Sequence, residues 1–256
     1  MTQVFSIKTL AKRLFGEREF WNTYLPFYDY MSKHPKYEKM LCDTYNALEI
    51  EKSTSGNFLD AGCGSGNFII YALNLNRNNI KFYGFDLSEK GLELVRKKAE
   101  KNNCIDRVDV IKYYFKEKLP YHDNMFDGIS AINFIMYLDD QTLENFIRES
   151  RRILKNSGKI ALVYPNGEIK LDKDLISKMH NELIENLKTT REKFKYSIIF
   201  TFILFLNIPM KMGLNTYPHT REKVENLLKK YGFSNINSKS TYYSDSVILT
   251  SGTIFK

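Results

Sequence analysis

Residues 58–68 (FLDAGCGSGNF) bring a carboxylate, a thiol and three glycines together within a few positions. Gly62, Gly64 and Gly66 alternate with other residues, and Asp60 stands two positions before the first of them. Glycine permits backbone angles that other residues avoid, and it lets a ligand approach the main chain closely. A helix that begins after such a loop offers free N–H groups to a polar ligand. This glycine loop, residues 62–66, therefore predicts a binding site for a small polar molecule.

The spacing of the glycines and a second acid narrow the class of ligand. A dinucleotide-binding loop reads GxGxxG, whereas this loop reads GxGxG and is followed by Asn67. Asp86 ends the apolar segment FYGFD, and an acid at the tip of a second strand can accept hydrogen bonds from ribose hydroxyls. Asp86 could instead be an ordinary acid at the start of a helix capped by Ser88. Its pairing with Asp60 and the glycine loop favours the ribose interpretation.

Placing these acids together requires alternating strands and helices. Short apolar segments alternate with helix-favouring ones, which predicts right-handed βαβ units and a mostly parallel sheet. A turn is expected at 156–158. The expected strands are 57–60, 80–85, 108–114, 126–133, 159–164, 233–239 and 247–254. The expected helices are 67–74, 88–102, 140–155 and 220–231.

The same pattern predicts one domain over residues 1–256 with four parts. Residues 1–55 read as a helical and aromatic cap, and residues 56–165 as the binding core. The strand and helix rhythm fails over residues 166–216, which we interpret as a helical insertion. It resumes over residues 217–256, which complete the sheet.

Charge and cysteine content limit the function classes. The net charge is +8, but the lysines are scattered, so an ordinary solvated surface is favoured over a nucleic-acid or membrane partner. Cys42, Cys63 and Cys104 form no CxxC pair, which argues against a disulfide framework and against a zinc or other metal site. The first residues lack the apolar core of a signal peptide. A cytoplasmic protein is expected.

The longest apolar run, residues 196–209 (YSIIFTFILFLNIP), is shorter than the roughly 20 residues that span a bilayer. It is apolar nearly all round, which predicts burial. Burial under a cap, in a homodimer or against lipid all remain open, and Lys193, Lys195 and Lys211 are compatible with a peripheral membrane contact.

Four segments in order carry a resemblance to a known family: FLDAGCGSG, FYGFDLS, FDGISAIN followed by YLDD, and LKNSG. Together they resemble the class I S-adenosylmethionine-dependent methyltransferases, of the small-molecule or lipid type with a methyltransferase-11/25-like domain. The resemblance covers roughly residues 55–165 and recurs over 217–256. It implies an α/β fold, a Rossmann-like doubly wound seven-stranded sheet whose last strand is antiparallel, with an N-terminal helical cap and a helical lid insertion before the last two strands. It also implies S-adenosyl-L-methionine as the cofactor.

By this resemblance Asp60 and the glycine loop hold the methionine end of the cofactor, Asp86 holds the ribose, and Leu87 packs on the adenine. The family often has an acid or amide just after the third strand, where this chain has Tyr114 and its neighbours, so Tyr114, Phe115 or Glu117 is expected to serve the adenine instead. The implied cofactor-binding residues are Asp60, Gly62, Cys63, Gly64, Gly66, Asp86, Leu87, Tyr114 and Asn133.

Methyl transfer from a sulfonium is an in-line displacement, so the protein mainly positions the reactants. The sequence identifies no catalytic residue. The candidate bases Tyr28, Asp29, His34 and His219 are each expected to be structural. The aromatic cap and the apolar insertion predict a small aromatic, hydrophobic or lipid-like acceptor. The expected substrate-pocket residues are Trp21, Tyr24, Tyr28 and Tyr137.

Two other function classes stay open. The sequence pI of about 9.1 is compatible with a nucleic-acid methyltransferase. However, the fourth strand ends in Asn-Phe-Ile-Met from Asn133, not in the Asn-Pro-Pro-aromatic sequence that amino-methylating base enzymes of the superfamily usually carry. No catalytic cysteine stands at a strand tip either, since Cys63 lies inside the glycine loop. A non-catalytic cofactor-binding protein is the third possibility, because the glycine loop and Asp86 indicate that a cofactor binds but not that a reaction follows.

Overall fold

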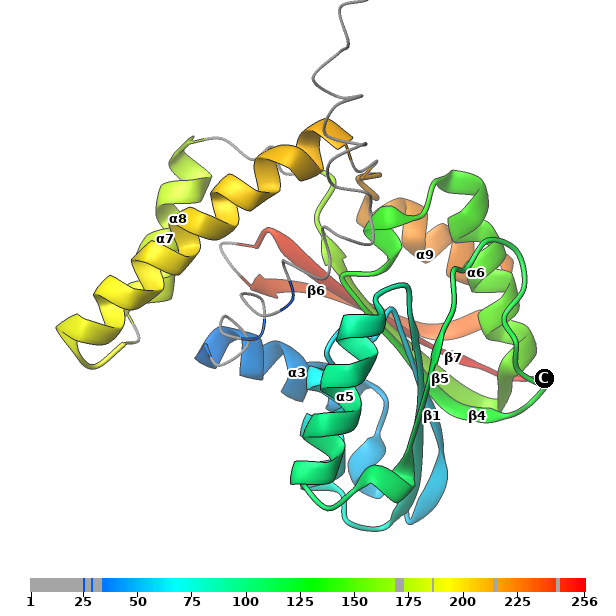
Figure 1. The fold of residues 1–256 in the computed structure, drawn as a ribbon. Helices are drawn as coiled ribbons and strands as arrows, with labels where there is room; N and C mark the ends of the chain where they lie inside the picture. Colours follow the sequence, from blue (N-terminus) through cyan, green and yellow to red (C-terminus); the bar gives the residue numbers. More distant parts are fainter. Residues whose placement is uncertain are drawn as a thin grey trace, which may run out of the picture.

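A seven-stranded sheet forms the centre of the protein in the computed structural model, which describes residues 25, 29, 34–168, 173–185, 187–213, 216–242 and 245–256. The strand order is β3-β2-β1-β4-β5-β7-β6 (Figure 1). The first five strands are parallel, and β7 runs antiparallel to both of its neighbours. The strands are β1 Ser55–Ala61, β2 Asn79–Asp86, β3 Val108–Lys112, β4 Phe126–Ile132, β5 Leu154–Pro165, β6 Phe233–Tyr242 and β7 Val247–Ile254. This confirms the predicted Rossmann-like doubly wound fold.

Helices cover both faces of the sheet because successive strand residues point to opposite sides. In β5, Ile160 and Leu162 join one buried cluster, whereas Ala161 and Val163 join the other. One cluster packs α3, α4 and α5 against the sheet, and the other packs α6 and α9 (Figure 1). The helices are α3 Pro35–Ala47, α4 Asn67–Leu75, α5 Glu89–Lys101, α6 Asp140–Ile153, α7 Lys173–Glu185, α8 Thr190–Gly213 and α9 Arg221–Lys230; the 3-10 helices are η1 Ile50–Lys52, η2 Ile105–Arg107 and η3 Ile135–Tyr137.

Several of these helices begin at side-chain caps, of which His34 at the start of α3 is one. The Ser88 hydroxyl accepts a hydrogen bond from the N–H of Gly91 at 3.0 Å, which confirms the predicted start of α5. Asp139 accepts from the N–H of Thr142 at 2.8 Å, and Thr220 caps α9 in the same way. Each Ser, Thr or Asp cap of this kind stabilises a helix by about 1 kcal/mol.

The start of β5 differs from the prediction. A turn was expected before a strand beginning at Lys159, but β5 already begins at Leu154. The expected turn is an irregularity inside the strand, where the register with β4 shifts between Phe126 and Gly128. Ser157 adopts a left-handed conformation there, with φ 63°. Turn-type residues therefore mark an irregularity in the pairing of β5 with β4, which the local sequence alone does not distinguish from a turn between two elements.

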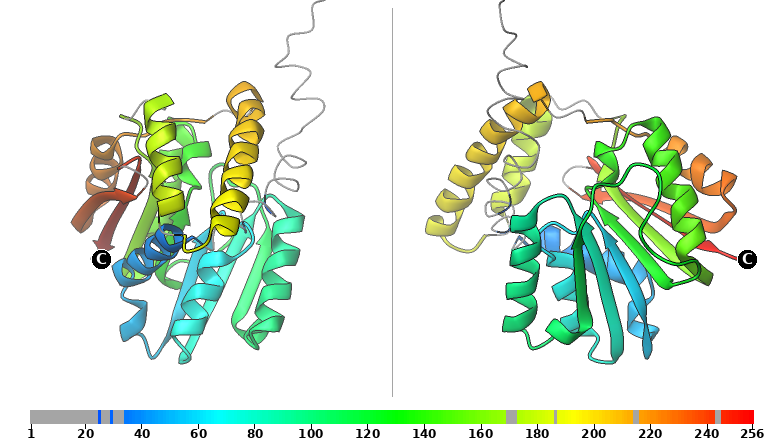
Figure 2. Two further views of the ribbon diagram at one scale, coloured as in Figure 1. Left: turned by 90° about the vertical axis from the view of Figure 1, so that its left-hand side faces the viewer. Right: turned by 45° about the vertical axis from the view of Figure 1, so that its right-hand side comes forward.

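The predicted helical insertion is present as α7 and α8, which lie side by side and project from the sheet on the side of α3 (Figure 2). Lys36 on α3 forms an ion pair with Glu182 on α7. The His34 ring packs edge-on against Tyr196 on α8, with centroids 5.9 Å apart. Within the described part of the chain, no helix is long and apolar enough to cross a membrane.

Candidate functional site

A cavity of about 690 Å³ lies at the carboxyl ends of the central parallel strands. Ligands of open α/β sheets bind at this edge. The cavity brings together all but one of the predicted cofactor-binding residues; the exception is Gly66. Those that line it are Asp60, Gly62, Cys63, Gly64, Asp86, Leu87, Tyr114 and Asn133.

The glycine loop adopts a conformation that only glycine accommodates well. Gly62, Gly64 and Gly66 have φ values of 65°, 53° and 75°. A Cβ on Gly62 would lie 2.5 Å from the Phe134 ring, and one on Gly66 would lie 2.9 Å from Val95. Gly62 and Gly66 therefore serve tight packing as well as the turn. Gly66 stands just before α4 and away from the cavity lining.

Gly64 differs from its two neighbours, because the space beside it is open to the cavity. Among the residues that the structure describes, a Cβ there would meet only Leu25, at an ordinary contact distance of 3.5 Å. The N–H of Gly64 donates to the Asp86 carboxylate at 2.9 Å. The backbone at Gly64 is thus the part of the loop that a ligand can approach closely.

Asp60 presents a buried carboxyl group near the end of β1. Burial raises the pKa of Asp60 to about 7. The Ser130 hydroxyl, which donates to Asp60 Oδ1 at 2.7 Å, acts in the opposite direction, and the charge of Asp86 raises the pKa further. A nearby cationic ligand group would favour the ionised form. Asp60 therefore suits the amino group of a bound amino acid.

Asp86 ends β2 and is held by backbone donors. Its carboxylate accepts from the N–H of Gly64 and, at 2.8 Å, from the N–H of Ser88. Burial raises the pKa of Asp86, and these N–H groups partly offset that effect. The carboxylate is fixed in direction at the cavity wall, as recognition of a ribose requires.

The Cys63 side chain is buried and packs against β2, where a Cβ on Gly84 would lie 3.0 Å from its sulfur. Burial raises the pKa of its thiol well above the usual value, and the charges of Asp86 and Asp60 raise it further. Only a thiolate attacks carbon readily. The Cys63 N–H donates to the carbonyl of Phe85 at 3.0 Å, which ties the glycine loop to β2. All three cysteines are free.

The segment between β3 and β4, residues 113–125, forms another wall of the cavity. Tyr114 is 56% exposed and Phe115 is buried against Phe146 of α6, with ring centroids 5.6 Å apart. Glu117 also lines the cavity. The three residues expected to serve the adenine are therefore all at this wall, together with Tyr113 and Lys116.

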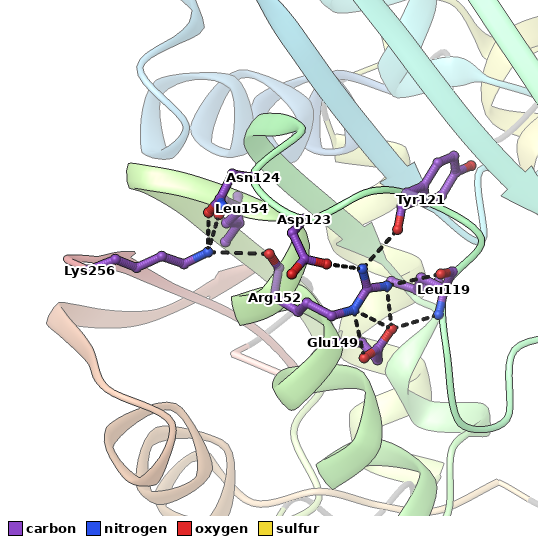
Figure 3. Close-up of polar contacts among 8 residues, drawn as sticks. All are labelled: Leu119, Tyr121, Asp123, Asn124, Glu149, Arg152, Leu154 and Lys256. Atoms are coloured by element: carbon purple, nitrogen blue, oxygen red, sulfur yellow. Dashed lines mark hydrogen bonds and ion pairs between the residues drawn. The ribbon is translucent and has the colours of Figure 1, made fainter.

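Side chains of α6 hold this β3–β4 segment in place (Figure 3). The Arg152 guanidinium donates to the carbonyls of Leu119 and Tyr121 at 3.0 and 2.8 Å, and to the Asp123 carboxylate at 2.7 Å. Glu149 accepts from Arg152 at 2.7 Å and from the N–H of Leu119 at 2.8 Å. Burial would raise the pKa of Glu149, but these donors bring it below the usual value. The ion pair between the buried Glu149 and the partly exposed Arg152 thus fixes the backbone at Leu119 and Tyr121, next to this wall of the cavity.

The fourth-strand tip and η3 supply the remaining described walls. Asn133 follows β4 in a left-handed conformation, with φ 55°, and its N–H donates to the carbonyl of Val163 at 2.8 Å. Tyr137, expected in the substrate pocket, lines the cavity. The other expected pocket residues, Trp21, Tyr24 and Tyr28, lie outside the described residues.

Three of the candidate bases have structural contacts. His34 caps α3 by accepting from the N–H of Lys36 at 3.2 Å. His219 Nε2 lies 3.1 and 3.0 Å from the carbonyls of Ile135 and Leu138, and burial lowers the pKa of its ring. The Asp29 carboxylate accepts hydrogen bonds from Ser65 in the glycine loop and from Asn67 just after it. None of the three lines the cavity.

Sequence reasoning missed several cavity residues that come from distant parts of the chain. Tyr217 precedes α9, and its N–H donates to the carbonyl of Met136 at 2.8 Å. Gln141 and Thr142 belong to the first turn of α6. No local motif marks these residues, because only the packing of α6 and residues 216–220 against η3 brings them to the cavity. Among the described residues, no cluster of His, Cys, Asp and Glu is arranged to hold a metal ion.

The donor set fits S-adenosylmethionine, which carries an ammonium group, a ribose and an adenine. Asp60 would hold the ammonium end, Asp86 the ribose, and Leu87 with Tyr114 the adenine faces. The open space at Gly64 lets such a ligand rest on the main chain. When bound, this cofactor supplies a methyl group already activated on a sulfonium.

Comparison with known proteins agrees with this geometry. The family described as a methyltransferase domain matches residues 58–158. The carboxy-S-adenosyl-L-methionine synthase of Campylobacter jejuni subsp. jejuni (strain 81-176) is 26% identical over 210 residues, which are 80% of each chain.

Two solved structures share the fold. A Methanococcus maripaludis protein, assigned as an S-adenosyl-L-methionine-dependent methyltransferase, has 20% identity and a TM-score of 0.60 over 93% of this chain and 94% of that one. Phosphoethanolamine N-methyltransferase 2 of Haemonchus contortus, solved with S-adenosyl-L-methionine, has 15% identity and a TM-score of 0.64. The match covers 99% of this chain but 61% of that protein. The matched residues 58–158 carry the whole glycine loop and Asp86, which identifies this part of the chain as a methyltransferase domain of the class I S-adenosylmethionine-dependent kind.

Proposed function

We propose that this methyltransferase acts on a small aromatic or hydrophobic acceptor that binds in the cavity beyond the glycine loop. The observation that carries the proposal is a group of aromatic and thioether side chains on one cavity: Tyr37, Met136, Tyr137 and Tyr217. They come from α3, η3 and residues 216–220. Small-molecule sites are typically apolar cavities of about 300–1,000 Å³, and this one falls in that range.

The proposed role of these side chains is to orient the acceptor and to exclude water. Methyl transfer needs a close, aligned approach of the acceptor atom to the methyl group, and an aromatic wall restricts a flat acceptor to few orientations. No side chain is assigned as a base. The relatives differ in what their names say they make or methylate, so the proposal rests on the cavity lining and not on likeness.

The test is transfer of labelled methyl from S-adenosylmethionine to three separate pools: phenols and aromatic amines, medium-chain lipids, and total RNA. We expect label in the first or second pool and none in RNA. The Tyr217→Ala variant should lose transfer while it binds S-adenosylhomocysteine normally. Tyr71→Ala is the matched control, because Tyr71 lies on α4 away from the cavity lining and packs against Tyr45.

Label in RNA alone would overturn the proposal and favour the nucleic-acid alternative. Tight cofactor binding without transfer to any of the three pools would favour a non-catalytic cofactor-binding protein. Equal losses of transfer in Tyr217→Ala and Tyr71→Ala would contradict the assignment of the acceptor wall.

A second proposal concerns α8, where a lipid-like acceptor could be reached at a membrane surface. Phe194 is 69% exposed and Ile198 is 53% exposed, and Lys193 and Lys195 are exposed beside them. The side chains of residues 202–209 lie outside the described residues. Peripheral membrane contact, homodimerisation through residues 196–209, and a lid role for residues 166–216 stay predictions.

Two measurements separate membrane contact from homodimerisation. Sedimentation with anionic vesicles should carry down the wild type, and a Phe194→Asp and Ile198→Asp double variant should stay in solution. Homodimerisation would instead appear in sedimentation velocity without vesicles and would be lost in the same double variant. A wild type that is monomeric and ignores vesicles would overturn both.

A further inference from the structure

Two described residues ahead of α3 reach the glycine loop. Leu25 and Asp29 are four positions apart, the spacing that places two side chains on one face of a helix. Leu25 is buried and lines the cavity. It also lies beside α5, because a Cβ on Gly91 would be 3.0 Å from its side chain. Leu25 therefore packs beside the glycine loop at Gly64 and forms the neighbouring part of the cavity wall.

The Asp29 carboxylate bonds to three side chains of the described residues. Its Oδ1 atom accepts from the Ser65 hydroxyl and, at 3.2 Å, from the Asn67 side-chain amide. Its Oδ2 atom lies 2.8 Å from Lys98 Nζ. Lys98 also donates to the Asn67 side-chain oxygen at 2.7 Å. These four side chains, Asp29, Ser65, Asn67 and Lys98, form one network, which we call the Asp29 network.

The position of this network suits a carboxylate. The α4 helix begins at Asn67 after Gly66, and no side chain of its own caps it. A helix N-terminus carries a partial positive charge that favours a nearby anion. Hydrogen bonds to a charged acceptor are also stronger than neutral ones. Asp29 thus supplies, from a segment far earlier in the chain, the negative charge that this helix start lacks locally.

The network acts on the walls of the cavity. Ser65 and Asn67 both line the cavity, whereas Asp29 and Lys98 do not. Each hydrogen bond from Ser65 or Asn67 to Asp29 therefore sets the direction of a cavity side chain from behind. Leu25 contacts the same loop, at Gly64.

We propose that Asp29 is a positioning residue for S-adenosylmethionine, which holds Ser65 and Asn67 so that the glycine loop keeps its binding conformation beside Leu25. This role goes beyond the choice of acceptor and does not depend on it. It also differs from that of a general base, since Lys98 and two further donors already engage the carboxylate.

The test compares Asp29→Asn with Asp43→Asn. Asp43 is a matched control, because it lies on α3, carries the same charge and forms ion pairs with Lys39 and Lys239 at 2.8 Å each, away from the cavity lining. Calorimetric titration with S-adenosylhomocysteine should show Asp29→Asn binding about tenfold more weakly, which corresponds to about 1.4 kcal/mol. Asp43→Asn should bind within about twofold of the wild type, because Asp43 and its two lysine partners do not line the cavity.

A second readout separates positioning from general destabilisation. Amide hydrogen exchange over residues 62–68 should be faster in Asp29→Asn than in Asp43→Asn, and saturating S-adenosylhomocysteine should slow it again. Lys98→Met tests the same network from α5, and it serves alone if Asp29→Asn does not fold. The loss of affinity in the Asp29→Asn and Lys98→Met double variant should be smaller than the sum of the single losses, because both act on one network.

The proposal is overturned if Asp29→Asn and Asp43→Asn bind S-adenosylhomocysteine equally well. It is also overturned if the double variant shows strictly additive losses, or if Lys98→Met binds like the wild type while exchange over residues 62–68 is unchanged.

Discussion

The glycine loop and the β3–β4 segment line the same cavity but are held in different ways. The glycine loop is shaped by its own backbone: three left-handed glycines, two of which leave no room for a Cβ. The β3–β4 segment has ordinary side chains and is held from outside by Glu149 and Arg152 of α6.

This difference explains why one segment has a sequence signature and the other has none. A backbone that must approach a ligand restricts the residue type at each position of the loop. The β3–β4 segment is held mostly through its backbone, by the carbonyls of Leu119 and Tyr121 and the N–H of Leu119, and its one side-chain contact with Arg152 comes from Asp123. Backbone contacts of this kind leave no recognisable motif in the sequence.

The largest expected effect is in the glycine loop. Gly62→Ala would strain a left-handed backbone and force a methyl group against Phe134, which should destabilise the protein by roughly 4 kcal/mol and abolish cofactor binding. Gly64→Ala carries the backbone strain without the clash, so it should lower the melting temperature less. Thermal unfolding of both variants measures the difference. Equal losses would contradict the distinction between packing and ligand approach.

The next effect is a pH dependence that arises from Asp60. Its folded pKa of about 7 lies above the unfolded value, so the folded state binds the proton more tightly. Its contribution to stability is present below about pH 4 and is lost as pH rises towards 7. Asp60→Asn removes this loss, so its stability relative to the wild type should rise by up to about 3 kcal/mol between pH 5 and pH 8.

Denaturant titration at several pH values measures this change in stability. The affinity for S-adenosylhomocysteine should change with pH in the opposite direction to the stability of the wild type. Binding to the wild type should strengthen as pH rises through 7, because the ionised Asp60 attracts the ligand ammonium group. A pH-independent stability difference between wild type and Asp60→Asn would refute the raised pKa.

A smaller effect is expected at the Glu149–Arg152 ion pair, which holds the β3–β4 segment. Arg152→Met leaves the buried Glu149 without its cation, which should cost about 2 kcal/mol of stability and also weaken cofactor binding. Arg151→Met is the matched control, since Arg151 donates to the carbonyl of Tyr231 and does not contact the β3–β4 segment. Cofactor affinity measured at equal fractions folded should fall only in Arg152→Met. A loss in both variants would mean that α6 does not act through this segment.

The smallest effect on stability is expected at Tyr114, one of the residues expected to contact the adenine. Tyr114→Ala removes a half-exposed ring from the cavity and should weaken S-adenosylhomocysteine binding by roughly 1 kcal/mol with little change in melting temperature. Phe115→Ala removes a buried ring and should show the reverse pattern. Calorimetry and thermal unfolding of the two variants check this, and a Tyr114→Ala variant with wild-type affinity would remove Tyr114 from the site.

Much of the fold was predictable because its signals are local. Ser88 caps α5 where a capping residue was expected, and β7 has the predicted bounds Val247–Ile254. The glycine loop and Asp86 lie on one cavity because carboxyl ends of neighbouring parallel strands always meet at one edge. The continuation of β5 through the expected turn was not predictable, since it depends on pairing with β4.

The sequence by itself determined the order of strands and helices, the glycine loop and the two strand-end acids, because hydrophobic period and glycine placement act over a few residues. Only the tertiary structure decided what holds these parts. Arg152 meets Leu119 across 33 residues of chain, and Asp29 meets Ser65 across 36. Such contacts involve common polar residues at no fixed spacing. Their energy comes from burial and geometry that exist only after the helices have packed on the sheet.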